Sequence, residues 1–134
     1  MAETRPEVLL IGTPEDVIRV RKEVRNQALA AGFGLVDQTK LVTAASELAR
    51  NTLICGGGGT VTIEPMRGAA RTGVRLIFED HGPGIADVAG ALTDGYTSGS
   101  GLGLGLGGAK RLSNEFEIRS EVGRGTRVTI ARWR

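Results

Sequence analysis

The start of the chain switches from strand-like to helical spacing of its apolar side chains. Residues 7–12 (EVLLIG) form a short apolar run of strand length. Thr13 and Pro14 then supply a side-chain cap and a residue suited to the first helical position. Four apolar residues follow at helical spacing: Val17, Val20, Val24 and Ala28. The pattern predicts a strand and then a helix that ends at Gly32.

A second helix is predicted to precede the glycine run at residues 56–59. Asp37 can cap its first turn, and the glycines end it. Five of its residues recur at i, i+3, i+4 and i+7 spacing: Leu41, Ala44, Ala45, Leu48 and Thr52. Such a stripe is typical of a helix that packs one face against a core.

Alternating apolar residues predict more strands, arranged in two pairs. The first pair covers residues 60–66 and 73–80, with a hairpin loop at 67–72 between them. The closing pair covers residues 116–120 and 126–133.

The segment between these pairs, residues 80–108, is expected to be mostly loop. It includes one helical turn at 87–92, and a helix begins near Gly107 and ends at Ser113 or Asn114. The order of elements is therefore β-α-α-β-β-loop-α-β-β. This order predicts a two-layer α/β (α+β) sandwich with helices on one face of a mixed sheet, formed by residues 1–134 as one domain.

Composition limits the class of protein. Hydrophobic residues make up 40% and charged residues 24% of the chain, as in ordinary globular proteins. The net charge of +2 does not by itself indicate nucleic-acid binding. Cys55 is the only cysteine in the sequence, which excludes an intrachain disulfide and a cysteine-based metal site. Since no signal-peptide region or membrane-length apolar run occurs, we expect a cytoplasmic protein without membrane or nucleic-acid partners. Three basic residues near the end are interpreted as a solvated tail: Arg127, Arg132 and Arg134.

Glycine is concentrated in two places. The sequence has 21 glycines, and most of the excess lies in residues 56–59 and 95–108. Between residues 99 and 108 glycine alternates with serine and leucine and leads into a helical segment. Backbone amides freed by glycine, together with a helix N-terminus, are suited to hold phosphate. A flexible linker is the alternative, although the leucines argue against plain disorder.

Glu47 and Asn51 form a second candidate group on the predicted second helix. Four residues apart, they share a helix face beside the apolar stripe. A carboxylate there can accept a proton or orient a hydroxyl, and the amide oxygen of Asn51 can be a neutral ligand to Mg²⁺. Taken alone, the pair also fits a solvated polar face.

A third candidate group, Asp80-His81-Gly82-Pro83-Gly84-Ile85, ends an apolar strand. Its glycines permit a tight backbone path beside a flat ligand, and a buried Asp80 can accept a hydrogen bond from an exocyclic amine, which favours adenine. An ordinary strand-to-turn junction has the same residue types, so this alternative stays open.

Other phosphate-binding and catalytic motifs do not apply. The glycines at 103, 105 and 108 fit G-x-G-x-x-G, but no strand precedes them, and the P-loop and eukaryotic kinase motifs are missing from the sequence. With one histidine and one cysteine, catalytic triads and zinc sites have too few parts. His81 is interpreted as a neighbour of the ligand loop and not as a catalyst.

Together these motifs resemble the GHKL (Bergerat-fold, histidine-kinase-like) ATP-binding family. The matching residues are Glu47 and Asn51 for its N box, Asp80, Gly82 and Gly84 for its first glycine box, residues 101–106 for its second, and Thr126 for its late threonine near the adenine. Within the family the chain resembles the stand-alone serine/threonine kinases that control sigma factors. The longer glycine ladder at residues 99–108 is a departure from that pattern.

The resemblance implies ATP and Mg²⁺ as cofactors. Glu47 would be catalytic, because it would orient or deprotonate the acceptor hydroxyl, and Asn51 would hold Mg²⁺. The residues implied in nucleotide binding are Asp80, which would read adenine, Gly82, Gly84, Ile85, Gly99, Gly101, Leu102, Gly103, Leu104, Gly105 and Thr126.

The resemblance also implies a role in a stress-response partner-switching (stressosome) pathway. The substrates would be serine or threonine residues of STAS-domain antagonist or scaffold proteins, and the kinase would activate a downstream phosphatase. The alternative is a nucleotide-gated binding module that sequesters a sigma factor or antagonist without turnover. A plain ATPase fits less well, because no power-transmitting domain is recognisable in the sequence.

Overall fold

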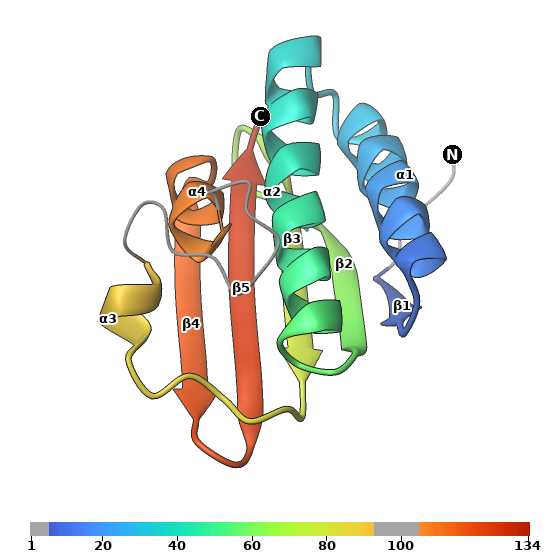
Figure 1. Ribbon diagram of the computed structural model, residues 1–134. Coiled ribbons are helices and arrows are strands. Elements are labelled where there is room, and N and C mark those ends of the chain that lie inside the picture. Colours follow the sequence, from blue (N-terminus) through green and yellow to red (C-terminus); the bar gives the residue numbers. More distant parts are fainter. Residues whose placement is uncertain (1–5, 93–104) are drawn as a thin grey trace.

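The computed structural model describes residues 6–92 and 105–134, which form two layers (Figure 1). One layer is a five-stranded sheet in the order β1-β2-β3-β5-β4. The strands are β1 (Glu7–Ile11), β2 (Gly59–Arg67), β3 (Thr72–Asp80), β4 (Glu115–Glu121) and β5 (Gly125–Trp133). The helices are α1 (Pro14–Ala30), α2 (Leu35–Ile54), the short α3 (Val88–Ala91) and α4 (Gly105–Arg111). Helices α1, α2 and α4 cover one face of the sheet, which confirms the predicted two-layer sandwich.

The prediction that the sheet is mixed is wrong, because every neighbouring pair of strands runs antiparallel. The connection through α4 does leave β3 and β4 pointing in the same direction. However, β5 turns back from β4 and inserts between them, so these two strands never pair.

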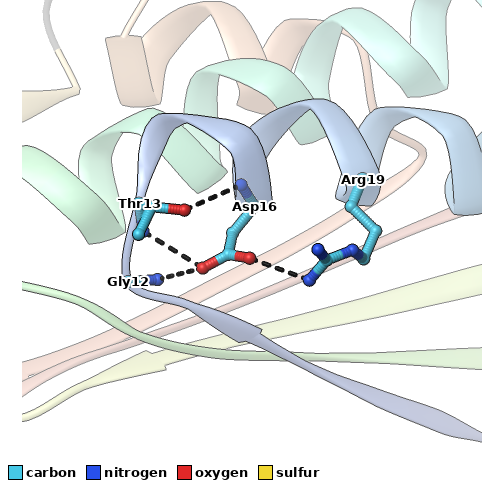
Figure 2. Close-up of polar contacts among 4 residues, drawn as sticks. All are labelled: Gly12, Thr13, Asp16 and Arg19. Atoms are coloured by element: carbon cyan, nitrogen blue, oxygen red, sulfur yellow. Dashed lines mark hydrogen bonds and ion pairs between the residues drawn. The ribbon is translucent and has the colours of Figure 1, made fainter.

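The start of α1 is fixed by a capping box (Figure 2). The Thr13 hydroxyl oxygen accepts a hydrogen bond from the Asp16 N–H at 3.2 Å. One Asp16 carboxylate oxygen accepts from the N–H groups of Gly12 at 2.9 Å and Thr13 at 3.1 Å, and the other pairs with Arg19 at 2.8 Å. These contacts, above all the Gly12 N–H, lower the pKa of Asp16. The predicted Thr13 cap and Pro14 at the first turn are confirmed.

The core lies between the helices and one face of the sheet. The α1 residues Val20, Val24 and Ala28 are fully buried, as their spacing predicted. All members of the predicted α2 stripe are buried, and the most exposed of them, Thr52, is 3% exposed. Burying a large aliphatic side chain such as Leu48 contributes about 1.5–3 kcal/mol. This packing fixes the rotation of α2 and so determines which of its polar side chains border the core.

Arg132 is not part of a solvated tail, which corrects the sequence interpretation. It lies in β5 with a side chain that is 12% exposed, and it donates to Asp37 Oδ1 at 2.7 Å and to the Leu112 carbonyl at 2.8 Å. Asp37 is therefore an ion-pair partner and not the predicted helix cap; Gly34 occupies the N-cap of α2. The arginine ties together the first turn of α2, the end of α4 and β5.

Two further findings concern the helices. Helix α4, predicted to begin near Gly107 and to end at Ser113 or Asn114, is described from Gly105 and ends at Arg111. The predicted turn at 87–92 is present as α3 with Asp87 as its N-cap. None of the helices in the described part of the chain is long and apolar enough to cross a membrane.

Candidate functional site

The two polar residues predicted on α2 lie beside its buried stripe. Glu47 and Asn51 are half-buried and one helical turn apart, next to the buried Leu48 and Thr52. Because the stripe is held against the core, the flank that carries this pair stays partly open. Asn51 borders a cavity, whereas Glu47 is not among the residues that line it.

This first cavity, of about 410 Å³, opens between the end of α2 and the loop that follows β3. Its lining consists of Asn51 and Cys55 at the end of α2, residues 83–87 of the loop, and Gly90 and Ala91 of α3. The structure therefore brings Asn51 together with Gly84 and Ile85. The volume falls within the range of roughly 300–1,000 Å³ that is usual for ligand pockets.

Glycine is required where the loop after β3 meets its neighbours. Gly84 has a φ of +78°, and a Cβ atom there would overlap the carbonyl oxygen of Glu121. A Cβ atom on Gly82 would lie 2.7 Å from the Cα of Gly56, just beyond α2. The loop is thus held close to both the end of α2 and the turn between β4 and β5.

Asp80 ends β3 as a nearly buried carboxylate. It is 8% exposed, and its Oδ1 accepts a hydrogen bond from the Gly82 N–H at 2.9 Å. Its side chain lies against Gly56, where any Cβ atom would overlap it. A carboxylate with one backbone donor keeps the capacity to accept a further hydrogen bond, such as that of the exocyclic amine of a base.

Thr126 lies directly opposite Asp80 in the register of β3 and β5. Its hydroxyl is 2.8 Å from that of Ser120, which also accepts from the Ile85 N–H at 2.7 Å and contacts the Gly125 carbonyl at 3.2 Å. Since a carbonyl only accepts, every group is satisfied when Ser120 donates to Gly125 and Thr126 donates to Ser120. The Thr126 oxygen then keeps lone pairs to accept a hydrogen bond from a ligand.

Asp80 and Thr126 line a second hollow, of about 400 Å³, at the ends of β3, β4 and β5. Asn51 is not part of its lining, so the structure does not bring all the predicted residues into one cavity. The loop after β3 connects the two, because Ile85 lines the first cavity and bonds Ser120 in the second. The other residues that line the second hollow are Glu79, His81, Arg119, Glu121, Arg124, Gly125 and Arg127.

Most of the glycine-rich segment that is predicted to hold phosphate lies outside the described residues, namely Gly99, Gly101, Leu102, Gly103 and Leu104. Gly105 is described and opens α4 with a φ of +48°. Leu106 and Ala109 bury α4 in the core beside α2. The role of the glycine-rich segment 99–108 in holding phosphate stays a prediction.

The donor groups of the site fit a nucleotide-bound metal ion. In residues 6–92 and 105–134, no three His, Cys, Asp or Glu side chains are grouped so that they could hold a metal by themselves. Asn51 offers one neutral oxygen donor at the first cavity. Mg²⁺ accepts so sparse a protein contribution when phosphates and water fill its other positions. Asp80 and Thr126 offer acceptors for a base, and they line the second hollow and not the cavity that Asn51 borders.

Sequence reasoning missed two residues that shape the site. Ser120 links the loop after β3 to β5. In the sequence it could have been noticed because Phe116, Ile118 and Ser120 alternate along β4 and all three are half-buried, so a polar side chain occupies an inward position. Asp87 lines the first cavity and caps α3 by accepting from the Gly90 N–H at 2.9 Å. Its signal was an aspartate at the start of the predicted helical turn.

Comparisons with known proteins agree with this architecture. The family described as "Histidine kinase-, DNA gyrase B-, and HSP90-like ATPase" matches residues 36–134, which include every described site residue. The serine/threonine-protein kinase RsbT of Bacillus subtilis (strain 168) is 42% identical over 123 residues, which cover 92% of each chain.

One solved structure, of the RsbU and RsbW domains of a Mycobacterium tuberculosis protein, aligns over 99% of this chain with a TM-score of 0.67. The identity is 23%, so this likeness concerns the fold alone, and the chain spans 34% of the length of that solved chain.

Proposed function

Because this chain belongs to the histidine kinase-, DNA gyrase B- and HSP90-like ATPase family, we propose that it is an ATP-dependent protein serine/threonine kinase. The identity of 42% to a serine/threonine-protein kinase extends over 92% of both chains, so the two proteins share nearly their whole length. One observation in this chain supports the proposal most directly: Asn51 borders the same cavity as Gly84 and Ile85. Glu47 lies one helical turn before Asn51 on α2.

The nucleotide is proposed to lie along the loop after β3. Asp80 and Thr126 would accept hydrogen bonds from the base, and the glycines at 82 and 84 would let the backbone approach it. Asn51 would hold Mg²⁺, which when bound neutralises phosphate charge during transfer. The ladder of glycines from 99 to 105 would surround the phosphates.

Glu47 is proposed to orient the acceptor hydroxyl and to take its proton. The serine or threonine oxygen forms a bond to the γ-phosphorus while the bond to the β–γ bridging oxygen breaks, and ADP leaves. Positioning and charge neutralisation provide most of the catalysis in this class of reaction, which suits a site with so few polar groups.

The substrates are proposed to be STAS-domain antagonist or scaffold proteins of a stress-response partner-switching pathway in the cytoplasm. After phosphorylation of its antagonist, the released kinase would bind and activate a downstream phosphatase. This finer assignment is supported by the resemblance to stand-alone kinases that control sigma factors.

The replacement Glu47→Gln tests the kinase assignment against a binding module that works without turnover. With γ-labelled ATP and a STAS-domain protein encoded beside this chain, we expect the wild type to label the partner on serine or threonine. E47Q should lose this labelling and keep ATP binding, while Glu117→Gln on the exposed β4 surface should behave as the wild type. Nucleotide-dependent partner binding without labelling would favour the binding module, and full labelling by E47Q would remove Glu47 from its role.

A further inference from the structure

The outward side of α1 carries one stripe of exposed apolar and basic side chains, the α1 stripe: Ile18, Arg21, Lys22, Arg25 and Leu29. These residues fall within an arc of about 100° around the helix axis, because each residue advances by about 100°. The two apolar members are well exposed, Ile18 at 62% and Leu29 at 55%. The buried residues Val20, Val24 and Ala28 of α1 belong to the core that α1 shares with α2 and the sheet.

The three cations of the α1 stripe form no ion pair within residues 6–92 and 105–134. Arginines elsewhere on the surface do have partners, as Arg75 has Glu64 at 3.7 Å. Two of the three acids of α1 are engaged elsewhere: Asp16 accepts hydrogen bonds in the capping box and pairs with Arg19, and Glu23 lies beside Glu7 at the start of β1. The third, Glu15, is exposed one turn before Ile18. The stripe therefore presents three positive charges, none in an ion pair within the described residues, between two apolar side chains.

From this arrangement we infer that the α1 stripe is a docking surface for an acidic amphipathic helix of a partner protein. The stripe runs straight for about 16 Å along a convex helix, a shape that packs well against a second helix. Carboxylates on the partner would meet the three cations, and apolar side chains would cover Ile18 and Leu29. Leu35 and Val36, 77% and 66% exposed at the same end of the helical layer as Leu29, add to the apolar surface there.

The same features disfavour the other polyanions. An interfacial membrane helix needs a broad apolar face, whereas the broad apolar face of α1 is buried in the core. A nucleic acid would gain nothing from apolar side chains at both ends of the stripe. None of the stripe residues lines the first cavity or the second hollow, so a partner docked on α1 leaves the nucleotide site open.

The probe for this surface is a synthetic amphipathic helix with leucine along one stripe and glutamate on both flanks. Fluorescence anisotropy measures its affinity for the full chain, so the readout is independent of phosphate transfer. The double replacement Arg21→Glu with Arg25→Glu should weaken binding by about tenfold or more. The matched control is Arg67→Glu with Arg75→Glu, which makes the same change of net charge on the sheet and should leave the affinity unchanged. The milder pair R21Q/R25Q should give an intermediate loss, and circular dichroism checks that each variant folds.

Further outcomes decide between the possible ligands. Rising salt should weaken binding of the peptide, and Ile18→Ser with Leu29→Ser should weaken it at constant charge. The proposal is overturned if the glutamate-flanked helix does not bind, if the control pair loses as much affinity as the α1 pair, or if a lysine-flanked helix binds equally well. It is also overturned if mixed phosphatidylserine–phosphatidylcholine vesicles or duplex DNA bind the stripe in preference to the peptide.

Discussion

Replacing Asp80 by asparagine tests recognition of the base with almost no change in volume. Oδ1 of Asp80 already accepts the Gly82 N–H at 2.9 Å, and the asparagine oxygen can take over that bond. The second carboxylate oxygen becomes an NH₂ group, which would face the adenine amine as one donor facing another. The variant therefore removes the proposed acceptor and leaves the local turn in place.

The size of the effect follows from burial. Asp80 is 8% exposed, so water cannot readily replace the lost acceptor. A hydrogen bond to a charged group contributes about 1.5–3 kcal/mol, which corresponds to about 10- to 150-fold in affinity. We expect the Kd of Mg²⁺-ATP to rise by such a factor, while the free energy of unfolding changes by less than about 1 kcal/mol.

Isothermal titration with two nucleotides isolates this contact. The second nucleotide is purine riboside triphosphate, which lacks the exocyclic amine. The wild type should bind it more weakly than ATP by a similar factor, and D80N should no longer distinguish the two. If D80N binds ATP within about threefold of the wild type, or loses the same affinity for both nucleotides, Asp80 does not read the amine.

Three further predictions concern stability. Arg132→Met leaves Asp37 and the Leu112 carbonyl without their donor. Because Asp37 is 39% exposed and regains water, we expect urea unfolding to show a free energy of unfolding lowered by about 2–3 kcal/mol. A decrease below about 0.5 kcal/mol would contradict the structural role of the pair. The lowered pKa of Asp16 gives a stabilisation that is present above its ordinary value of 3.8 and lost as pH falls through the folded pKa, so Asp16→Asn should be less stable than the wild type at neutral pH and approach it in acid. The ionised Glu7 side chain has the opposite effect on stability, because burial and then Glu23 raise its pKa. Glu7→Gln should therefore be more stable than the wild type at neutral pH and equal to it in acid. If urea unfolding gives pH-independent stability differences for both the Asp16 and the Glu7 variants, these assignments are refuted.

The elements that were predicted correctly depend on local chemistry. Thr13 and Pro14 are suited to a helix start wherever they precede a helical pattern, and the capping box formed as expected. The α2 stripe that includes Leu48 is set by the helical repeat, and the strands by alternation of apolar residues. Hence the spacing of Glu47 and Asn51 on one flank of α2 could be derived before any tertiary contact was known.

The features that were not predicted depend on contacts between distant residues. Arg132 and Asp37 are 95 residues apart, so their pairing, which makes Asp37 a partner and not a cap, leaves no local signal. The insertion of β5 between β3 and β4 is likewise a property of the assembled sheet. The same limit applies to the site: the resemblance to an ATP-binding family indicated that Asn51 and Asp80 belong together, but not that they line two different hollows joined by the loop after β3.

The most direct test of the account is a crystal structure with Mg²⁺ and a non-hydrolysable ATP analogue. We predict the adenine amine within hydrogen-bond distance of Asp80, Thr126 beside the base, and the metal ion on the Asn51 oxygen with the phosphates close to Gly105. An analogue bound away from Asn51, or with its base far from Asp80, would contradict the proposed site.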